Sequence, residues 1–211
     1  MSTCMRRYAA RAVLMAAAAA ALGGCKGREA RTDTTTAGGA VATRDTSMRG
    51  DTGAAARHGD WTDAQILAFA SAANSGEIEE GRIAARKATN PAVKAFARQM
   101  ITDHQAMLTE GKTFASKNSI RPDTTKSDVT DLKKDSRDLV KDLTSKKPGK
   151  DWDEDYIEHE IDGHKKVLDK LQDAEKSTTN ADLKAMLTKA VGKVQEHLTK
   201  AEDIKDNKLK T

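Results

Sequence analysis

Four long segments of the chain, beginning near Asp60, carry apolar side chains at steps of three and four residues. This spacing places those side chains on one face of an α-helix, and no alternating run indicates a β-strand. Aromatic residues make up only 3% of the chain, so a core must be built mainly from Ala, Leu, Ile, Val and Met. The pattern therefore predicts an all-α protein in which each long helix buries one apolar face.

Most of the expected helices begin at a recognisable start signal. Capping-box spacing occurs at Thr62 and again at Asp151, while Asn90 is followed by Pro91 at the first helical position. We predict long helices from Thr62 to about Thr89, from Asn90 to about Asn118, from Asp151 onward and from Asn180 to about Ile204, and a short helix that Ser127 caps and that stops at 146–149.

The lengths of the connections predict how these helices are arranged. Loops of one to a few residues join the first helix to the second and the third to the fourth, so each pair should form an antiparallel hairpin. The stretch from Ser119 to Lys150 is long enough to travel back along the bundle. We therefore expect residues 60–211 to form a ferritin-like four-helix bundle, with the short helix in the crossover between helices two and three. The alternative is an up-down-up-down bundle with an inserted helix.

The N-terminus has the features of an export signal. Arg6, Arg7 and Arg11 precede an apolar run over 12–22 that is too short to span a bilayer. The run ends in Leu22-Gly23-Gly24-Cys25, which resembles the bacterial lipobox. We expect residues 1–24 to be a lipoprotein signal peptide and Cys25 to be lipidated, which anchors the protein in a membrane on its periplasmic face. Lys26 after the cysteine favours the outer membrane, and an ordinary signal peptide cut near Gly24 is the alternative.

Residues 25–59 have the composition of a flexible tether. They are rich in Thr, Ala, Gly, Arg and Asp and contain almost no large apolar side chain, so they cannot bury enough surface to offset the entropy of ordering. The net charge of the whole chain is +4, of which the three N-terminal arginines supply three. The remainder is nearly neutral, so we expect no nucleic-acid partner.

Polar side chains interrupt the apolar stripes at matching depths. His104, His164 and His197 each lie on an inner face near the middle of a helix, and Glu77 takes the same kind of position on the first helix. One carboxylate and three imidazoles that meet at one level could hold a zinc, iron, manganese or copper ion. Candidates for outer positions that orient these groups are Glu80, Asp103 and Glu160.

A bundle core without metal explains the same residues in a different way. Buried histidines and a glutamate can form a hydrogen-bonded network, since burial without partners is costly. Met100, Met107 and Met186 could indicate copper, but methionine more commonly fills gaps in a core. Both explanations of the four residues stay open at this point.

Several segments together resemble a known bacterial family. They are 75–81, 88–97, 100–104, Asp162-Gly163-His164 and 195–198. They are similar to the secreted family called domain of unknown function 4142, and the resemblance covers about Trp61 to Ile204. It implies a ferritin-like fold and an outer-membrane location rather than a reaction.

The chain departs from ferritin-like proteins that bind two irons. Those proteins carry a glutamate three residues before a histidine on two of their helices. Here the residues three before the histidines are Ile101, Ile161 and Val194, so no carboxylate di-iron site is expected. Three functions follow as hypotheses: a module that binds one metal ion, a metal-free structural or partner-binding envelope lipoprotein, and a redox enzyme. No nucleophile or phosphate loop favours an enzyme, and the partner and oligomeric state are left open.

Overall fold

The computed structural model describes residues 61–209, which form five helices and no strand. The helices are α1 (Asp63–Lys87), α2 (Pro91–Lys117), α3 (Ser127–Ser145), α4 (Lys150–Ser177) and α5 (Ala181–Asn207). The predicted all-α fold is confirmed. None of the helices within residues 61–209 contains a stretch that is apolar enough, over the length needed, to span a bilayer. The predicted signal peptide, the tether and Cys25 lie outside the described residues.

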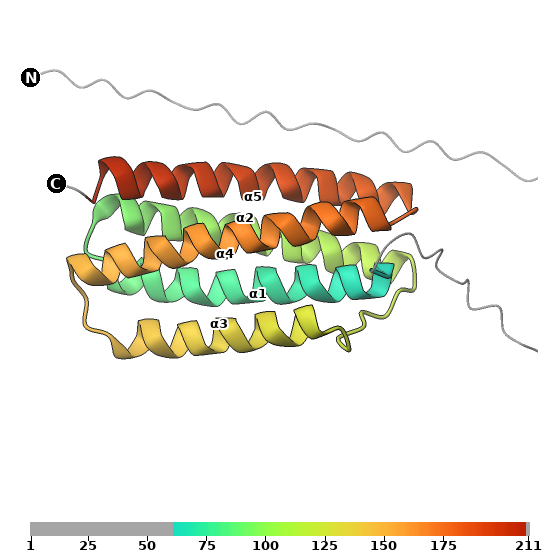
Figure 1. Cartoon of the computed structure of the whole chain (residues 1–211), viewed down its shortest axis with the longest axis horizontal. Coiled ribbons are helices and arrows are strands. Elements are labelled where there is room, and N and C mark those ends of the chain that lie inside the picture. The colour runs from blue at the N-terminus through green and yellow to red at the C-terminus, as the bar shows by residue number, and fades with distance from the viewer. Residues whose placement is uncertain (1–60, 210–211) are drawn as a thin grey trace, which may run out of the picture. The chain divides into compact units, whose positions relative to one another are not determined.

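Two helical hairpins form the body of the structure. Helix α1 packs against α2, and α4 packs against α5, while α3 lies along α1. Helix α3 carries the chain back along the bundle, so α2 and α4 run in the same direction (Figure 1). The α1–α4 and α2–α5 contacts join the two hairpins.

Three of the predicted start signals act as N-caps. The Thr62 hydroxyl accepts from the amide of Gln65, whose side chain accepts from the Thr62 amide, which completes a capping box. Asn90 and Asn180 accept amide hydrogen bonds at the starts of α2 and α5. Each cap pairs backbone donors that the helix itself leaves unpaired.

Two of the predicted caps are wrong. Ser127 is the first helical residue of α3 and not its cap, and Lys126 at the cap position makes no side-chain capping bond. Helix α4 begins at Lys150, one residue before the predicted Asp151, after Gly149 at φ 159° and ψ −178°. Only glycine adopts this backbone region readily, so the turn at Gly149 sets the start of α4 without help from a side chain.

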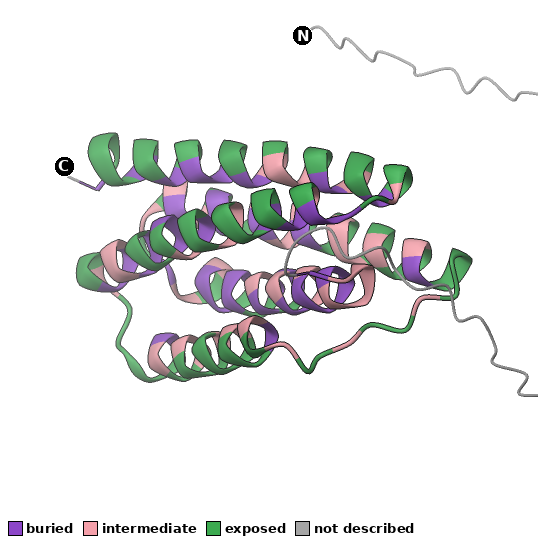
Figure 2. Ribbon diagram, turned by 45° about the vertical axis from the view of Figure 1, so that its right-hand side comes forward, coloured by how far each residue is buried: buried purple, intermediate pink, exposed green. Residues whose placement is uncertain are grey.

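Buried residues lie along every helix, drawn in purple in Figure 2. The apolar ones among them form two clusters. One contains large side chains, among them Phe96, Met100, Trp152 and Tyr156. The other is built mainly from aliphatic residues of α1, α4 and α5. The buried polar side chains include Asn74, Glu80, His104, Glu160, His164 and His197.

Asp153 on α4 ties the two hairpins together. Its carboxylate is 1% exposed and accepts hydrogen bonds from the Thr89 amide at 3.0 Å, the Thr89 hydroxyl at 2.6 Å and the Asn90 amide at 2.7 Å. The turn between α1 and α2 is thereby fixed to the first turn of α4. No sequence pattern indicates this contact, because it joins residues more than sixty positions apart.

Replacing Asp153 with Ala should destabilise the fold. The amides of Thr89 and Asn90 would lose their acceptor, so the free energy of unfolding should fall by about 3 kcal/mol. Urea unfolding followed by circular dichroism measures this change. The control is D151A at an exposed position of the same turn, which should cost about 0.5 kcal/mol or less. Equal losses in the two variants would show that Asp153 does not anchor the hairpins.

Candidate functional site

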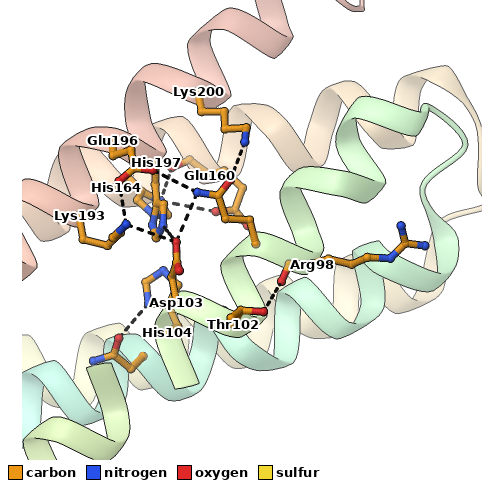
Figure 3. Close-up of polar contacts among 12 residues, drawn as sticks. Arg98, Thr102, Asp103, His104, Glu160, His164, Lys193, Glu196, His197 and Lys200 are labelled. Carbon is orange, nitrogen blue, oxygen red and sulfur yellow. Dashed lines mark hydrogen bonds and ion pairs between the residues drawn. The ribbon is translucent and has the colours of Figure 1, made fainter. Parts of the chain in front are cut away.

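Three buried histidine rings meet in the interior, each from a different helix. His104 comes from α2, His164 from α4 and His197 from α5, and their ring centroids are 5.1, 5.5 and 5.9 Å apart (Figure 3). One ring nitrogen of each lies within 4.8 Å of the others. The three rings therefore form a group that could hold a metal ion.

The proton on His104 can be assigned from its partner on α1. The Asn74 amide nitrogen donates to the backbone oxygen of Ala70 at 2.7 Å, which leaves the Asn74 Oδ1 facing His104. His104 Nδ1 lies 2.8 Å from that oxygen. An amide oxygen can only accept, so Nδ1 is the nitrogen that carries the proton and Nε2 keeps a lone pair.

The protonated nitrogens of the other two rings can be assigned in the same way. His164 Nδ1 lies 2.8 Å from the backbone oxygen of Glu160, and His197 Nε2 lies 2.9 Å from Asp103 Oδ2. A carbonyl and a carboxylate accept, so both nitrogens donate. Asp103 is itself held by Gln99 at 3.3 Å and by Lys193 at 3.8 Å.

Each ring is left with one nitrogen that has a lone pair and no donor. These atoms are His104 Nε2, His164 Nε2 and His197 Nδ1, and all three are buried without a hydrogen-bond partner. A buried acceptor without a donor carries the full cost of its desolvation. Three such acceptors in one group suit a cation, since imidazole lone pairs are the usual nitrogen ligands of zinc, copper and iron.

The predicted ligand Glu77 belongs to a different group. A carboxylate oxygen of Glu77, one of Glu160 and a ring nitrogen of His164 lie within 4.8 Å of one another, and no such group among residues 61–209 joins Glu77 to His104 and His197. Glu77 Oε1 is 3.9 Å and Glu160 Oε2 is 3.5 Å from His164 Nδ1, the protonated side of that ring. The reason is the register of α1: it presents Asn74 to His104, while Glu77, almost one turn later, lies beside His164 of α4.

Glu80 contacts α3 and not a histidine. Its carboxylate accepts from the Ser136 hydroxyl at 2.7 Å. Gly76 makes this approach possible, because a Cβ there would lie 2.5 Å from Ser136 Oγ. Glu80, predicted to orient the central groups, therefore joins α3 to α1.

Burial sets the charges around the rings. It raises the pKa of Glu77 and of Glu160 well above the ordinary value, and neighbouring carboxylates add to both rises. It also raises the pKa of Glu80 to about 7. Burial first, and then the charges of His164 and His197, hold the pKa of His104 well below its ordinary value. Near neutral pH the ring of His104 is thus free of a second proton that would compete for its lone pair.

Asn74 is a residue of this site that the sequence pattern did not single out. It is 8% exposed in the middle of α1 and is the direct partner of His104. A buried amide on the inner half of an apolar helix, one turn before Glu77, was the available signal. The sequence predicts orienting roles for Asp103 and Glu160. Asp103 contacts His197 through its carboxylate, whereas Glu160 bonds to His164 through its backbone oxygen.

A comparison with family models gives one match for this chain. The family described as "domain of unknown function" (DUF4142) matches residues 48–204, which is well over half of the chain. Neither the curated proteins nor the solved structures contain a match. The description of the family names no ligand and no reaction.

The raised pKa of Glu80 predicts a stability that falls as pH rises. The folded chain holds the Glu80 proton up to about pH 7, while the unfolded carboxyl releases it near the ordinary value of 4.5. The metal-free protein should therefore lose stability between about pH 4.5 and 7, by roughly 3 kcal/mol from this group. Urea titrations across this range, with chelator present, measure the slope.

The E80Q variant isolates that contribution. Glutamine stays neutral and can still accept from Ser136, so the decline should be smaller and the variant should be the more stable protein at pH 8. E202Q, at an exposed position of α5 away from Glu80, should keep the wild-type slope. A slope that E80Q leaves unchanged would exclude Glu80 as its source.

Proposed function

The chain belongs to the DUF4142 family, and we propose that it is an exported helical module that binds one transition-metal ion through His104, His164 and His197. The observation that carries this proposal is that each of the three grouped rings has one buried nitrogen with a lone pair and no donor. In a metal-free network at least one of these nitrogens would need a donor. The described residues supply none within hydrogen-bonding distance.

The donor set favours a single ion. Three neutral imidazoles suit zinc, copper, iron or manganese to different degrees, and they leave at least one coordination position for water or another ligand. Ile101, Ile161 and Val194 stand where a di-iron protein has glutamates. The two carboxylates near the rings, Glu77 and Glu160, face the protonated Nδ1 of His164. The acceptors on the far side of the rings are Asn74, Asp103 and the Glu160 backbone, which keep the free nitrogens directed inward.

The arrangement of the helices supports a ferritin-like bundle as part of this proposal. Two antiparallel hairpins with α2 and α4 parallel match the single-crossover topology of such folds. In that topology the metal ligands project inward from facing helices near mid-height. The three histidines come from three of the four long helices, which agrees with this placement.

Titration of the metal-free protein tests the proposed centre. Protein without a histidine tag, stripped with chelator, should bind one zinc ion per chain in calorimetry, and zinc should raise its melting temperature. Copper, iron and manganese are titrated in parallel to rank affinity. H197Q should lower the affinity at least 100-fold, because one of three ligands is lost.

Two further variants make the metal test specific. N74A keeps all three histidines but removes the acceptor that orients the His104 ring, so the affinity for zinc should fall 10–100-fold. H159Q removes an exposed histidine of α4 and should change nothing. If no metal gives saturable binding, or if H197L is stabilised and responds to zinc as the wild type does, the histidines serve a metal-free core instead.

The proposal includes export of the protein and its anchoring in a membrane through a lipid on Cys25. The arginines, the apolar run and the sequence that ends at Cys25 support a lipoprotein signal, and Lys26 supports the outer membrane. Labelling with a palmitate analogue in a bacterial host should mark the wild type and not C25S, and only the wild type should fractionate with membranes. Equal labelling of both proteins would rule out Cys25 as the lipidated residue.

A further inference from the structure

We propose that the cavity between α1, α2, α4 and α5 binds the hydrocarbon chain of an anionic single-chain amphiphile. The cavity has a volume of about 450 Å³, within the range of small-molecule sites. His104 and Asn74 form part of its wall, and the exposed lysines of α2 and α5 lie at its rim. This inference does not depend on the proposed metal ion, since none of the histidine nitrogens proposed to bind the ion is needed to hold the hydrocarbon chain.

Small side chains create the cavity. Ala70 and Ala73 on α1 and Ala190 on α5 line it, whereas the other apolar cluster is filled by rings such as Phe96 and Trp152. Met107 and Gly111 of α2 follow the buried His104 at steps of three and four residues, yet both are only half-buried. They lack neighbours across the bundle because the cavity stands where those neighbours would be.

The shape and the lining of the cavity fit an extended apolar chain. Its wall on α2 reaches from Asp103 to Ala115, a span of roughly 18 Å along the helix. The apolar side chains that line it include Leu67, Val167, Leu171, Met186, Leu187 and Val194. Such a long apolar lining suits hydrocarbon better than a compact polar molecule.

Asn74 and Asp103, at the inner end, are already paired, and the free His104 Nε2 is an acceptor that cannot bind an anion. Asn74 bonds to His104 and to the Ala70 backbone, and Asp103 bonds to His197. These groups offer no strong site for a charged head. The polar end of a ligand is therefore expected at the rim and not beside the histidines.

The rim carries more positive than negative charge. Three lysines line the cavity, Lys112, Lys189 and Lys193, together with two acidic residues, Asp103 and Glu110. Lys193 is half-buried and pairs with Asp103 and Glu196, so Lys112 and Lys189 are the exposed ammonium groups. Lys189 of α5 lies 3.8 Å from Glu110 of α2, so this pair joins the two helices at the rim. A carboxylate or phosphate head would meet lysine ammonium groups there, while the chain lies between the helices.

Direct binding of defined amphiphiles tests this inference on chelator-treated protein. Dodecanoate should bind at one per chain in calorimetry and should displace the fluorescent probe N-phenyl-1-naphthylamine. The neutral 1-dodecanol should bind more weakly. A lysophosphatidylglycerol with the same chain distinguishes a phospholipid source from a free fatty acid: the tighter of the two anionic ligands identifies the source, and the failure of both overturns the proposal.

Variants locate the chain and the head. A190L fills the cavity and should weaken dodecanoate at least tenfold, while A95L on the exposed face of α2 should bind as the wild type does. K189E should weaken dodecanoate and leave 1-dodecanol unchanged. Unchanged binding to A190L would overturn the placement of the chain, and unchanged binding to K189E would overturn the placement of the head.

An observation on the wild type keeps the test valid should A190L fail to fold. The methyl groups of Met107 and Met186 line the cavity, and their carbon-13 signals can be assigned from M107L and M186L. Dodecanoate should shift both signals, while the signal of Met100, which lies in the other apolar cluster, should stay in place. Shifts at neither cavity methionine would overturn the proposal whatever the metal content of the sample.

Discussion

Three imidazole lone pairs buried without a donor are the constraint that the centre of this protein has to satisfy. Each of His104, His164 and His197 donates from one ring nitrogen to a fixed acceptor, which leaves the other nitrogen as an acceptor in the interior. Such a group is costly to bury unless a cation occupies it. The tautomers are assigned by an amide, a backbone carbonyl and a carboxylate, and none of these can act as a donor in the observed contacts.

The contacts around this centre hold the helices in register. Asn74 of α1 bonds to His104 of α2, and Asp103 of α2 bonds to His197 of α5, so the rings couple helices from both hairpins. Farther out, the bond between Glu80 and Ser136 holds α3 on α1, and Asp153 holds the α1–α2 turn on α4. A shift of one helix by a single turn would break several of these bonds at once.

The two parts of the core differ in how tightly their side chains pack. Large rings such as Trp152 and Tyr156 fill one apolar cluster, whereas alanines such as Ala73 and Ala190 leave the cavity bordered by His104. Close packing is the rule in protein interiors, so a hollow of this size lined by apolar groups needs an explanation from function. The centre and the cavity share the His104 ring as a wall, yet they call for ligands of opposite character, a cation and a hydrocarbon chain.

The helices, most of their start signals and the depth of the three histidines follow from the amino-acid sequence alone, because they depend on local backbone bonding and on a period of 3.6 residues. The sequence could not decide which neighbour each inward side chain meets. In the tertiary structure Asn74 bonds to His104, Glu77 lies on the protonated side of His164, and Glu80 bonds to Ser136. Helical periodicity fixes the face and height of a residue, but the rotation of each helix and the side chains of its neighbours decide which atoms touch. The cavity likewise depends on the tertiary structure. Alanines leave a hollow only where the facing helices also carry no side chain long enough to fill it.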